Sequence, residues 1–173
     1  MKKVLFVLVC ALLLCAIAAP AAQASEPPAM PPVLSPASGV WSGGYTEAGF
    51  GWDAMLLGWT YAFNNQERGT WSGTFNGTSV EPWVFYVDPD GNIWAVITIH
   101  FKGTVDGRRG KALIAVVLSI PAGSTEPMRG QWSVIRGRGE LKRLHGLGTW
   151  AWTHDDEAAM LSYADYSGVI WWQ

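Results

Sequence analysis

Cysteine is nearly absent from this 173-residue sequence, and its two copies, Cys10 and Cys15, both lie in an apolar N-terminal segment. We expect this segment to be removed, which leaves a chain without thiols. Such a chain has no disulfide bonds, no cysteine nucleophile and no cysteine ligand for a metal ion. A hydrophobic core alone must therefore stabilise the fold, and the 149 residues after position 24 are enough for one such core.

Recognisable catalytic and metal-binding motifs are also missing. The three histidines, His100, His145 and His154, have no ligand spacing such as H-x-H or H-E-x-x-H, and no serine lies in a G-x-S-x-G turn. We therefore expect no metal site and no cofactor. The candidates for an acid or base are Glu81, at the start of an aromatic strand, and His100. The alternative is that both side chains are structural.

An excess of positive charge is lacking as well. Without Lys2 and Lys3, ten basic residues remain against fourteen acidic ones, so the net charge is −4. A nucleic-acid-binding domain is normally strongly basic, so no nucleic-acid partner is expected. Nine of the ten basic residues lie between Lys102 and Arg143. Within this stretch, we interpret one basic run as a solvated face, with attraction to an anionic surface or glycan as the alternative; the run is Arg129, Arg136, Arg138, Lys142 and Arg143.

The N-terminal segment has the pattern of a secretory signal peptide. Lys2 and Lys3 precede the apolar run 4–19, and Ala22-Gln23-Ala24 provides the small residues that a signal peptidase requires. We predict cleavage after Ala24 and hence a secreted or periplasmic protein with no membrane span in the mature chain. The alternative is a retained anchor, although the run is shorter than the roughly 20 residues of a spanning helix.

Helical periodicity is absent from the rest of the chain, where short apolar runs alternate with period 2. Residues 25–39 carry five prolines and are predicted to form a linker or extended arm, which places the globular domain at 40–173. The pattern predicts an all-β barrel or sandwich of seven or eight strands. Pro82 predicts an edge position or a bulge in its strand. Predicted strands include 58–63, 69–75, 80–87, 93–105, 111–120, 129–138, 147–153 and 161–172.

One predicted strand is apolar on both faces. The run Ala112–Leu118 has no polar residue, whereas the outer face of a barrel wall is normally polar. We therefore expect a cover over this outer face, provided by the arm at 25–38, by the Trp-rich C-terminus or by a second copy of the chain. Of these, we favour a homo-oligomer.

Glycine-rich motifs between Phe101 and Gly148 carry a family resemblance. The sequence reads F-x-G-T-V-D-G-R-x-G and, one strand later, G-x-W-x-V-x-x-G-x-G-E-L-x-x-L-x-G-L-G. This pattern resembles the DUF3224-type proteins of the allene-oxide-cyclase-like barrel superfamily over roughly the C-terminal two-thirds of the mature chain. The matching positions are Gly103, Asp106, Gly107, Gly110, Gly130, Trp132, Gly137, Gly139, Glu140, Leu141, Leu144, Gly146 and Gly148.

The resemblance implies a single antiparallel eight-stranded barrel with a central cavity, often assembled as an oligomer. It implies no activity, because DUF3224-type proteins have no established reaction and no active-site residue of the plant cyclases matches a position here. We interpret the matching glycines as turns, bulges and close backbone approaches. Leu141 and Leu144 are expected to cap one end of the core, and Glu140 to anchor a turn through backbone N–H groups.

The eleven tryptophans are the strongest indication of function. Trp83 and Phe85 share one strand face, and Trp132, Val134 and Arg136 share another if their strand is unbroken. An aromatic lining with an arginine at the mouth suits an amphipathic ligand that carries an anionic group. We therefore predict ligand-binding roles for Trp83, Phe85, Trp132 and Arg136. The alternative is that the rings fill a solid core and an oligomer interface.

These observations favour an exported small β-barrel that binds an apolar or amphipathic small molecule. Two alternatives stay open. The first is a cyclase- or isomerase-type enzyme that acts on a hydrophobic substrate, and the second is a structural or cell-surface protein that works as an oligomer.

Overall fold

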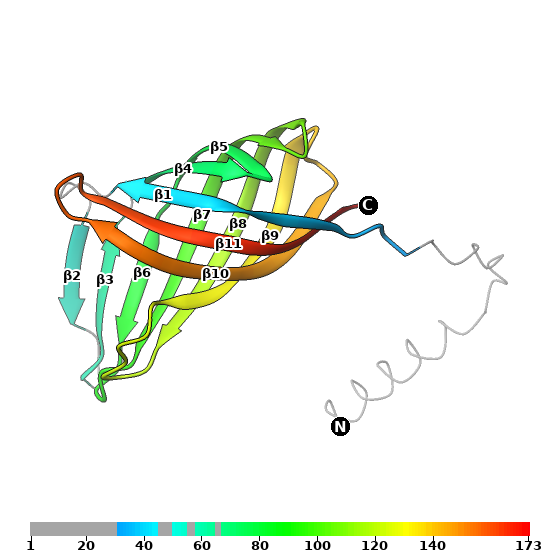
Figure 1. The fold of residues 1–173 in the computed structure, drawn as a ribbon. Helices are drawn as coiled ribbons and strands as arrows, with labels where there is room; N and C mark the ends of the chain where they lie inside the picture. The colour runs from blue at the N-terminus through cyan, green and yellow to red at the C-terminus, as the bar shows by residue number, and fades with distance from the viewer. Residues whose placement is uncertain (1–30, 45–49, 55–57, 65–66) are drawn as a thin grey trace, which may run out of the picture. The chain divides into compact units, whose positions relative to one another are not determined.

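The computed structural model describes residues 31–44, 50–54, 58–64 and 67–173, with only the backbone described for 50–54. The predicted signal peptide and residues 25–30 of the proline-rich arm lie outside these ranges. Residues Pro32–Gln173 form one compact unit, which Figure 1 shows as a barrel of curved strands. The described part of the chain contains no helix long and apolar enough to span a membrane.

Eleven antiparallel strands are formed by the described residues of this unit. Short turns join most of them, and the longest strands are β7, β8 and β10. The strands are β1 (Ser35–Gly44), β2 (Phe50–Ala54), β3 (Thr60–Asn64), β4 (Arg68–Gly73), β5 (Phe75–Val80), β6 (Trp83–Val87), β7 (Ile93–Val105), β8 (Arg108–Ile120), β9 (Arg129–Gly139), β10 (Leu144–Asp156) and β11 (Leu161–Trp172).

Eight of the strands close into a ring in the order β1, β4, β5, β7, β8, β9, β10 and β11. Closure depends on β7, which pairs with β5 along one edge and with β8 along the other, and on the pairing of β11 with β1. The prediction of a single antiparallel eight-stranded barrel is confirmed. A closed ring also removes the unpaired strand edges that promote aggregation.

The other three strands, β2, β3 and β6, form a short sheet that extends one side of the barrel. β6 continues the line of β5, because β5 ends at Val80, β6 begins at Trp83 and both pair with β7. β3 continues the line of β4 in the same way. The predicted single strand at 80–87 is therefore two strands. Pro82 lies in an interior break rather than at an edge, and its carbonyl oxygen accepts a hydrogen bond from Thr98 N at 2.9 Å.

Aromatic rings fill the middle of the barrel. Inward and outward residues alternate along the regular strands, as β7 shows with Ile99 and Phe101 buried and Val96 and His100 exposed. Neighbouring ring centroids lie 5.2–6.4 Å apart, mostly in the tilted or edge-to-face arrangements that aromatic pairs prefer. The cluster consists of Trp41, Trp71, Phe75, Phe101, Trp132, Trp150 and Tyr166.

The glycine-rich motif builds the closed end of the barrel. Leu141 and Leu144 are fully buried there, and Glu140 Oε2 accepts a hydrogen bond from Arg109 N at 2.6 Å. Both expectations for these residues are confirmed. Gly148 makes room for the Trp132 indole, because a Cβ atom at that position would lie 2.7 Å from Trp132 Nε1. This part of the motif therefore serves packing rather than chemistry.

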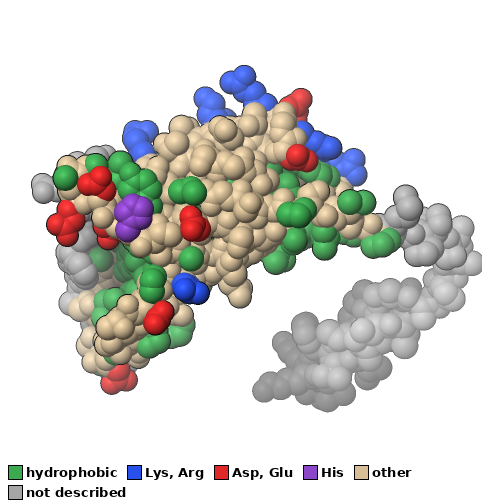
Figure 2. All heavy atoms as spheres, viewed as in Figure 1, with side chains coloured by type: hydrophobic (Ala, Val, Ile, Leu, Met, Phe, Trp, Pro, Cys, Tyr) green, Lys and Arg blue, Asp and Glu red, His purple; other side chains and the backbone are tan. Residues whose placement is uncertain are grey.

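The outer wall carries an exposed apolar strip. Val117 on β8 is 54% exposed, and Trp94 and Val96 on the adjoining strand β7 are also exposed, as is Leu147 on β10 beyond β9. The C-terminal tryptophans do not cover this strip, since they pair within β11 against the start of β10. Charged side chains also lie on the outer surface of the protein. Figure 2 shows Lys and Arg gathered along the upper edge of its view.

The barrel wall also begins earlier than position 40. β1 starts at Ser35, which pairs with Ile170 of β11, and Ala37 is buried in the core. The last five residues assigned to the arm therefore belong to the barrel.

Candidate functional site

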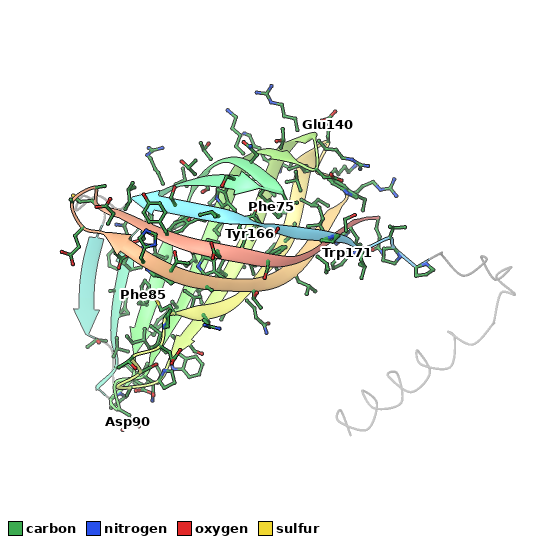
Figure 3. All side chains as sticks on the ribbon, viewed as in Figure 1. Phe75, Phe85, Asp90, Glu140, Tyr166 and Trp171 are labelled. Carbon is green, nitrogen blue, oxygen red and sulfur yellow. The ribbon has the colours of Figure 1, made fainter. Side chains whose placement is uncertain are left out.

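A cavity of about 710 Å³ opens at the end of the barrel where the strand lines β4/β3 and β5/β6 are interrupted. One wall is formed by β6 and β7, and the opposite wall by the ends of β10 and β11 with the turn that joins them. Figure 3 labels Phe85 at this end, whereas Glu140 and Trp171 lie toward the other end of the barrel. The solid aromatic core separates the cavity from the closed end.

Aromatic rings provide most of the apolar lining. Trp83 and Phe85 lie two residues apart on β6, both line the cavity, and they pack edge to face with ring centroids 4.6 Å apart. Across the cavity, Trp152 of β10 packs against Trp41, with centroids 5.9 Å apart. Ile97 of β7 completes the apolar surface. Such a lining fits a flat or elongated apolar group.

Two buried glutamates meet at the base of this cavity. Glu67 lies just before β4 and Glu81 just after β5, and Glu81 N donates a hydrogen bond to Glu67 O at 2.9 Å. The two residues are 6% and 1% exposed, respectively. Glu67 lines the cavity itself. The two strand breaks, one before β4 and one after β5, lie at the same level on adjacent strands. They turn the chain inward there and so position both carboxyl groups.

A hydrogen-bond network holds the Glu81 carboxyl group. Trp41 Nε1 donates to Glu81 Oε1 at 2.8 Å, and the Ser79 hydroxyl donates to the same oxygen. Trp71 Nε1 donates in turn to Ser79 Oγ at 2.8 Å. Gly69 leaves the space for this arrangement, since a Cβ atom there would lie within 2.6 Å of Ser79 Oγ. With Oε1 accepting two donors, a proton on Glu81 resides on Oε2.

Both glutamates hold protons more tightly than an exposed carboxyl group. Burial raises the pKa of Glu81 to about 7, although its hydrogen bonds from Ser79 and Trp41 oppose the rise. Burial and the neighbouring Glu81 charge raise the pKa of Glu67 to about 8, against a lowering by the Trp83 hydrogen bond. Two carboxyl groups in one desolvated site cannot both ionise easily, so the pair retains a proton near neutral pH.

The rim of the cavity is acidic. Asp155, Asp156 and Glu157 lie at the end of β10 and in the following turn, and all three line the opening. Trp152 Nε1 donates to Asp155 Oδ1 at 3.0 Å, and Ser162 Oγ donates to the same oxygen at 2.7 Å. No Lys, Arg or His is present among the described residues that line the cavity. The electrostatic potential at the opening is therefore negative.

The four predicted ligand-binding residues separate into three places. Trp83 and Phe85 line the cavity, and Glu81 lies beneath it. Trp132 is only 2% exposed and packs in the core, where its indole N–H donates to Ser167 O at 3.1 Å. Arg136 lies on the outer face of β9, as does His100 on β7.

The expectation that Trp132, Val134 and Arg136 share a face is wrong, because β9 is not unbroken. The pairing of β8 with β9 shifts register between Leu113 and Ile114, so that Ile135 is an extra residue on β9. This β-bulge reverses the alternation after Val134 and turns Arg136 outward.

Several cavity residues were missed by the sequence reasoning. In the sequence, Glu67 follows the polar residues Asn64-Asn65-Gln66 and directly precedes an alternating strand, which is the only local hint of its position. Trp152 and the acidic turn lie far along the chain and reach the cavity only because β10 and β11 extend past the end of the barrel core. The pairing of Glu67 with Glu81 depends on strand register, which local composition does not reveal.

Comparisons with known proteins identify the fold. No family model and no curated protein matches the sequence. A crystal structure of a DUF3224-family protein of unknown function from Shewanella oneidensis MR-1 matches with a TM-score of 0.59 and 16% identity, over 82% of this chain and 98% of that one. The structure of a pterocarpan synthase dirigent protein matches with a TM-score of 0.51 and 12% identity, over 90% of this chain and 100% of that one. The chain therefore has the eight-stranded barrel fold of the DUF3224-family structure, which the dirigent protein also shares.

Proposed function

We propose that the protein binds an amphipathic small molecule in the open-end cavity, with the apolar part between the aromatic walls and a cationic end at the rim. One observation carries this proposal: a cavity of about 710 Å³ has tryptophan and phenylalanine walls, and every charged residue in its described lining is acidic. The predicted signal peptide supports a role outside the cytoplasm.

The charge of the ligand follows from the placement of the residues. Arg136, the expected partner for an anionic group, lies on the outer face, so the described lining offers an anion no positive counterpart. A cation is attracted both by the rim carboxylates and by the faces of Trp83 and Trp152. The proton held by the glutamate pair adds a hydrogen-bond donor at the base of the cavity.

The test uses three ligands with the same apolar chain and different ends, namely decylamine, decanol and decanoate. Isothermal titration calorimetry should show the amine binding most tightly and the carboxylate most weakly. Phe85→Ala should weaken amine binding, because the ring lines the cavity wall. Trp94→Ala is the matched control, since its ring lies on the outer face of β7. Decanoate binding as tight as that of decylamine, or an equal effect of both variants, would contradict the proposal.

A second candidate function is acid catalysis of a cyclisation or isomerisation, and Glu67 favours it. This carboxyl group faces the cavity and has a pKa of about 8, so it can donate a proton to a bound substrate at neutral pH. With a substrate drawn from the ligands that bind, Glu67→Gln should abolish turnover and leave binding intact. Turnover should also fall as the pH rises through about 8. Unchanged turnover in Glu67→Gln would exclude this role.

A further inference from the structure

A second hollow, of about 720 Å³, lies on the outer wall across β4, β5, β7, β8 and β9. Five Lys and Arg side chains and His100 line it, and its described lining contains no carboxylate. We call this hollow the basic groove. Its basic residues are Arg68, Lys102, Lys111, Arg136 and Arg138.

Strand register arranges three of these cations in a row. Lys102 of β7 pairs directly with Lys111 of β8, which pairs with Arg138 of β9. Adjacent strands lie about 4.8 Å apart. Like charges placed directly opposite one another destabilise a sheet, so this row is unfavourable for folding by itself. The bulge at Ile135 completes the row, because it turns both Arg136 and Arg138 to the outside.

Hydroxyl groups extend the same row beyond the cations. Thr78 of β5 pairs with Lys102, and Thr70 of β4 pairs with Thr78. Both threonines line the groove. The row therefore offers three positive charges followed by two hydroxyls over five adjacent strands, in a hollow rather than on a protruding surface.

We propose that the basic groove binds a linear acidic polysaccharide. The negative charges of such a polymer repeat along its length and would neutralise the cation row, while its hydroxyl groups can hydrogen-bond Thr70 and Thr78. Single-stranded nucleic acid fits less well, because its bases need exposed aromatic rings for stacking. Among the described lining residues, Phe101 is the one Phe, Tyr or Trp, and it is only 1% exposed. The groove lies on the outer wall and shares no described lining residue with the cavity.

Calorimetric titration with polygalacturonate tests the proposal, with neutral dextran as the control polymer. We expect polygalacturonate to bind, dextran not to bind, and the affinity to fall as added salt screens the charges. The triple variant Lys102→Gln, Lys111→Gln, Arg138→Gln should bind about tenfold more weakly or worse, because it loses the charge-assisted contacts of the row. The control is Lys142→Gln with Arg143→Gln, which removes two exposed charges from the turn between β9 and β10.

Stability measurements separate binding from folding. The triple variant should unfold at the same or a higher urea concentration than the wild type, because like-charge repulsion is removed. Three results would overturn the proposal. They are a lack of polygalacturonate binding at low salt, tighter binding of a thymidine oligonucleotide or of phosphatidylglycerol vesicles, and an equal loss of affinity in the control variant.

Discussion

Raising the pH should destabilise this protein through the buried glutamate pair. Both carboxyl groups have raised pKa values in the folded protein, about 8 for Glu67 and about 7 for Glu81, against an ordinary value of 4.5. Between about pH 4.5 and about pH 8, the folded protein therefore binds more protons than the unfolded chain. Under these conditions the free energy of unfolding falls as the pH rises.

The magnitude follows from the size of the shift. Each carboxyl group that ionises only in the unfolded chain lowers the free energy of unfolding by about 1.4 kcal/mol per pH unit. For Glu67 the loss between about pH 5 and about pH 7 is about 2–3 kcal/mol. Glu81 contributes in the same direction, and its contribution levels off sooner because its pKa is lower.

Urea unfolding followed by tryptophan fluorescence measures this dependence. Glu67→Gln, which cannot ionise, should reduce the slope and should be more stable than the wild type at about pH 8. Glu126→Gln, a substitution at an exposed position, should leave the wild-type slope unchanged. A wild-type free energy of unfolding that stays constant or rises from about pH 5 to about pH 7 would refute the reasoning.

Three further predictions concern other parts of the chain. Gly69→Ala should lower the free energy of unfolding by about 2–4 kcal/mol in urea, because its Cβ atom collides with the buried network, whereas outward-facing Thr70→Ala should have little effect. Light scattering should find an oligomer for the wild type and a monomer for Val117→Glu if the exposed apolar strip is an interface between copies, and a monomeric wild type would exclude that interface. Intact-mass measurement of the exported protein should give a chain that begins at Ser25, and a retained leader would contradict the predicted cleavage site.

The regular parts of the fold were predictable because each strand face has a uniform environment. The bounds of β7 and β11 match the prediction, since inward residues such as Ile99 alternate with outward ones such as His100. The closed end was predictable from its glycines and from Leu141, which serve local packing. In these segments, local sequence and tertiary environment favour the same structure.

The candidate site was predictable only in part. Trp83 and Phe85 could be placed on one face because they are two residues apart on one strand. The pairing of Glu67 with Glu81 could not, because it depends on two breaks that coincide in adjacent strands. Arg136 was assigned to the wrong face of β9. The period-2 pattern does not reveal the bulge, because the extra residue, Ile135, is itself apolar.

The bulge in β9 also determines on which side of the barrel wall its arginines lie. With regular pairing through Ile135, alternation from Trp132 would direct Arg136 and Arg138 into the aromatic interior, where an unpaired charge is strongly unfavourable. The charge of the outer wall is thus governed by strand pairing as well as by residue identity. Two chains with the same arginines, one with this bulge and one with regular pairing through the same residues, would present them on opposite sides of the wall.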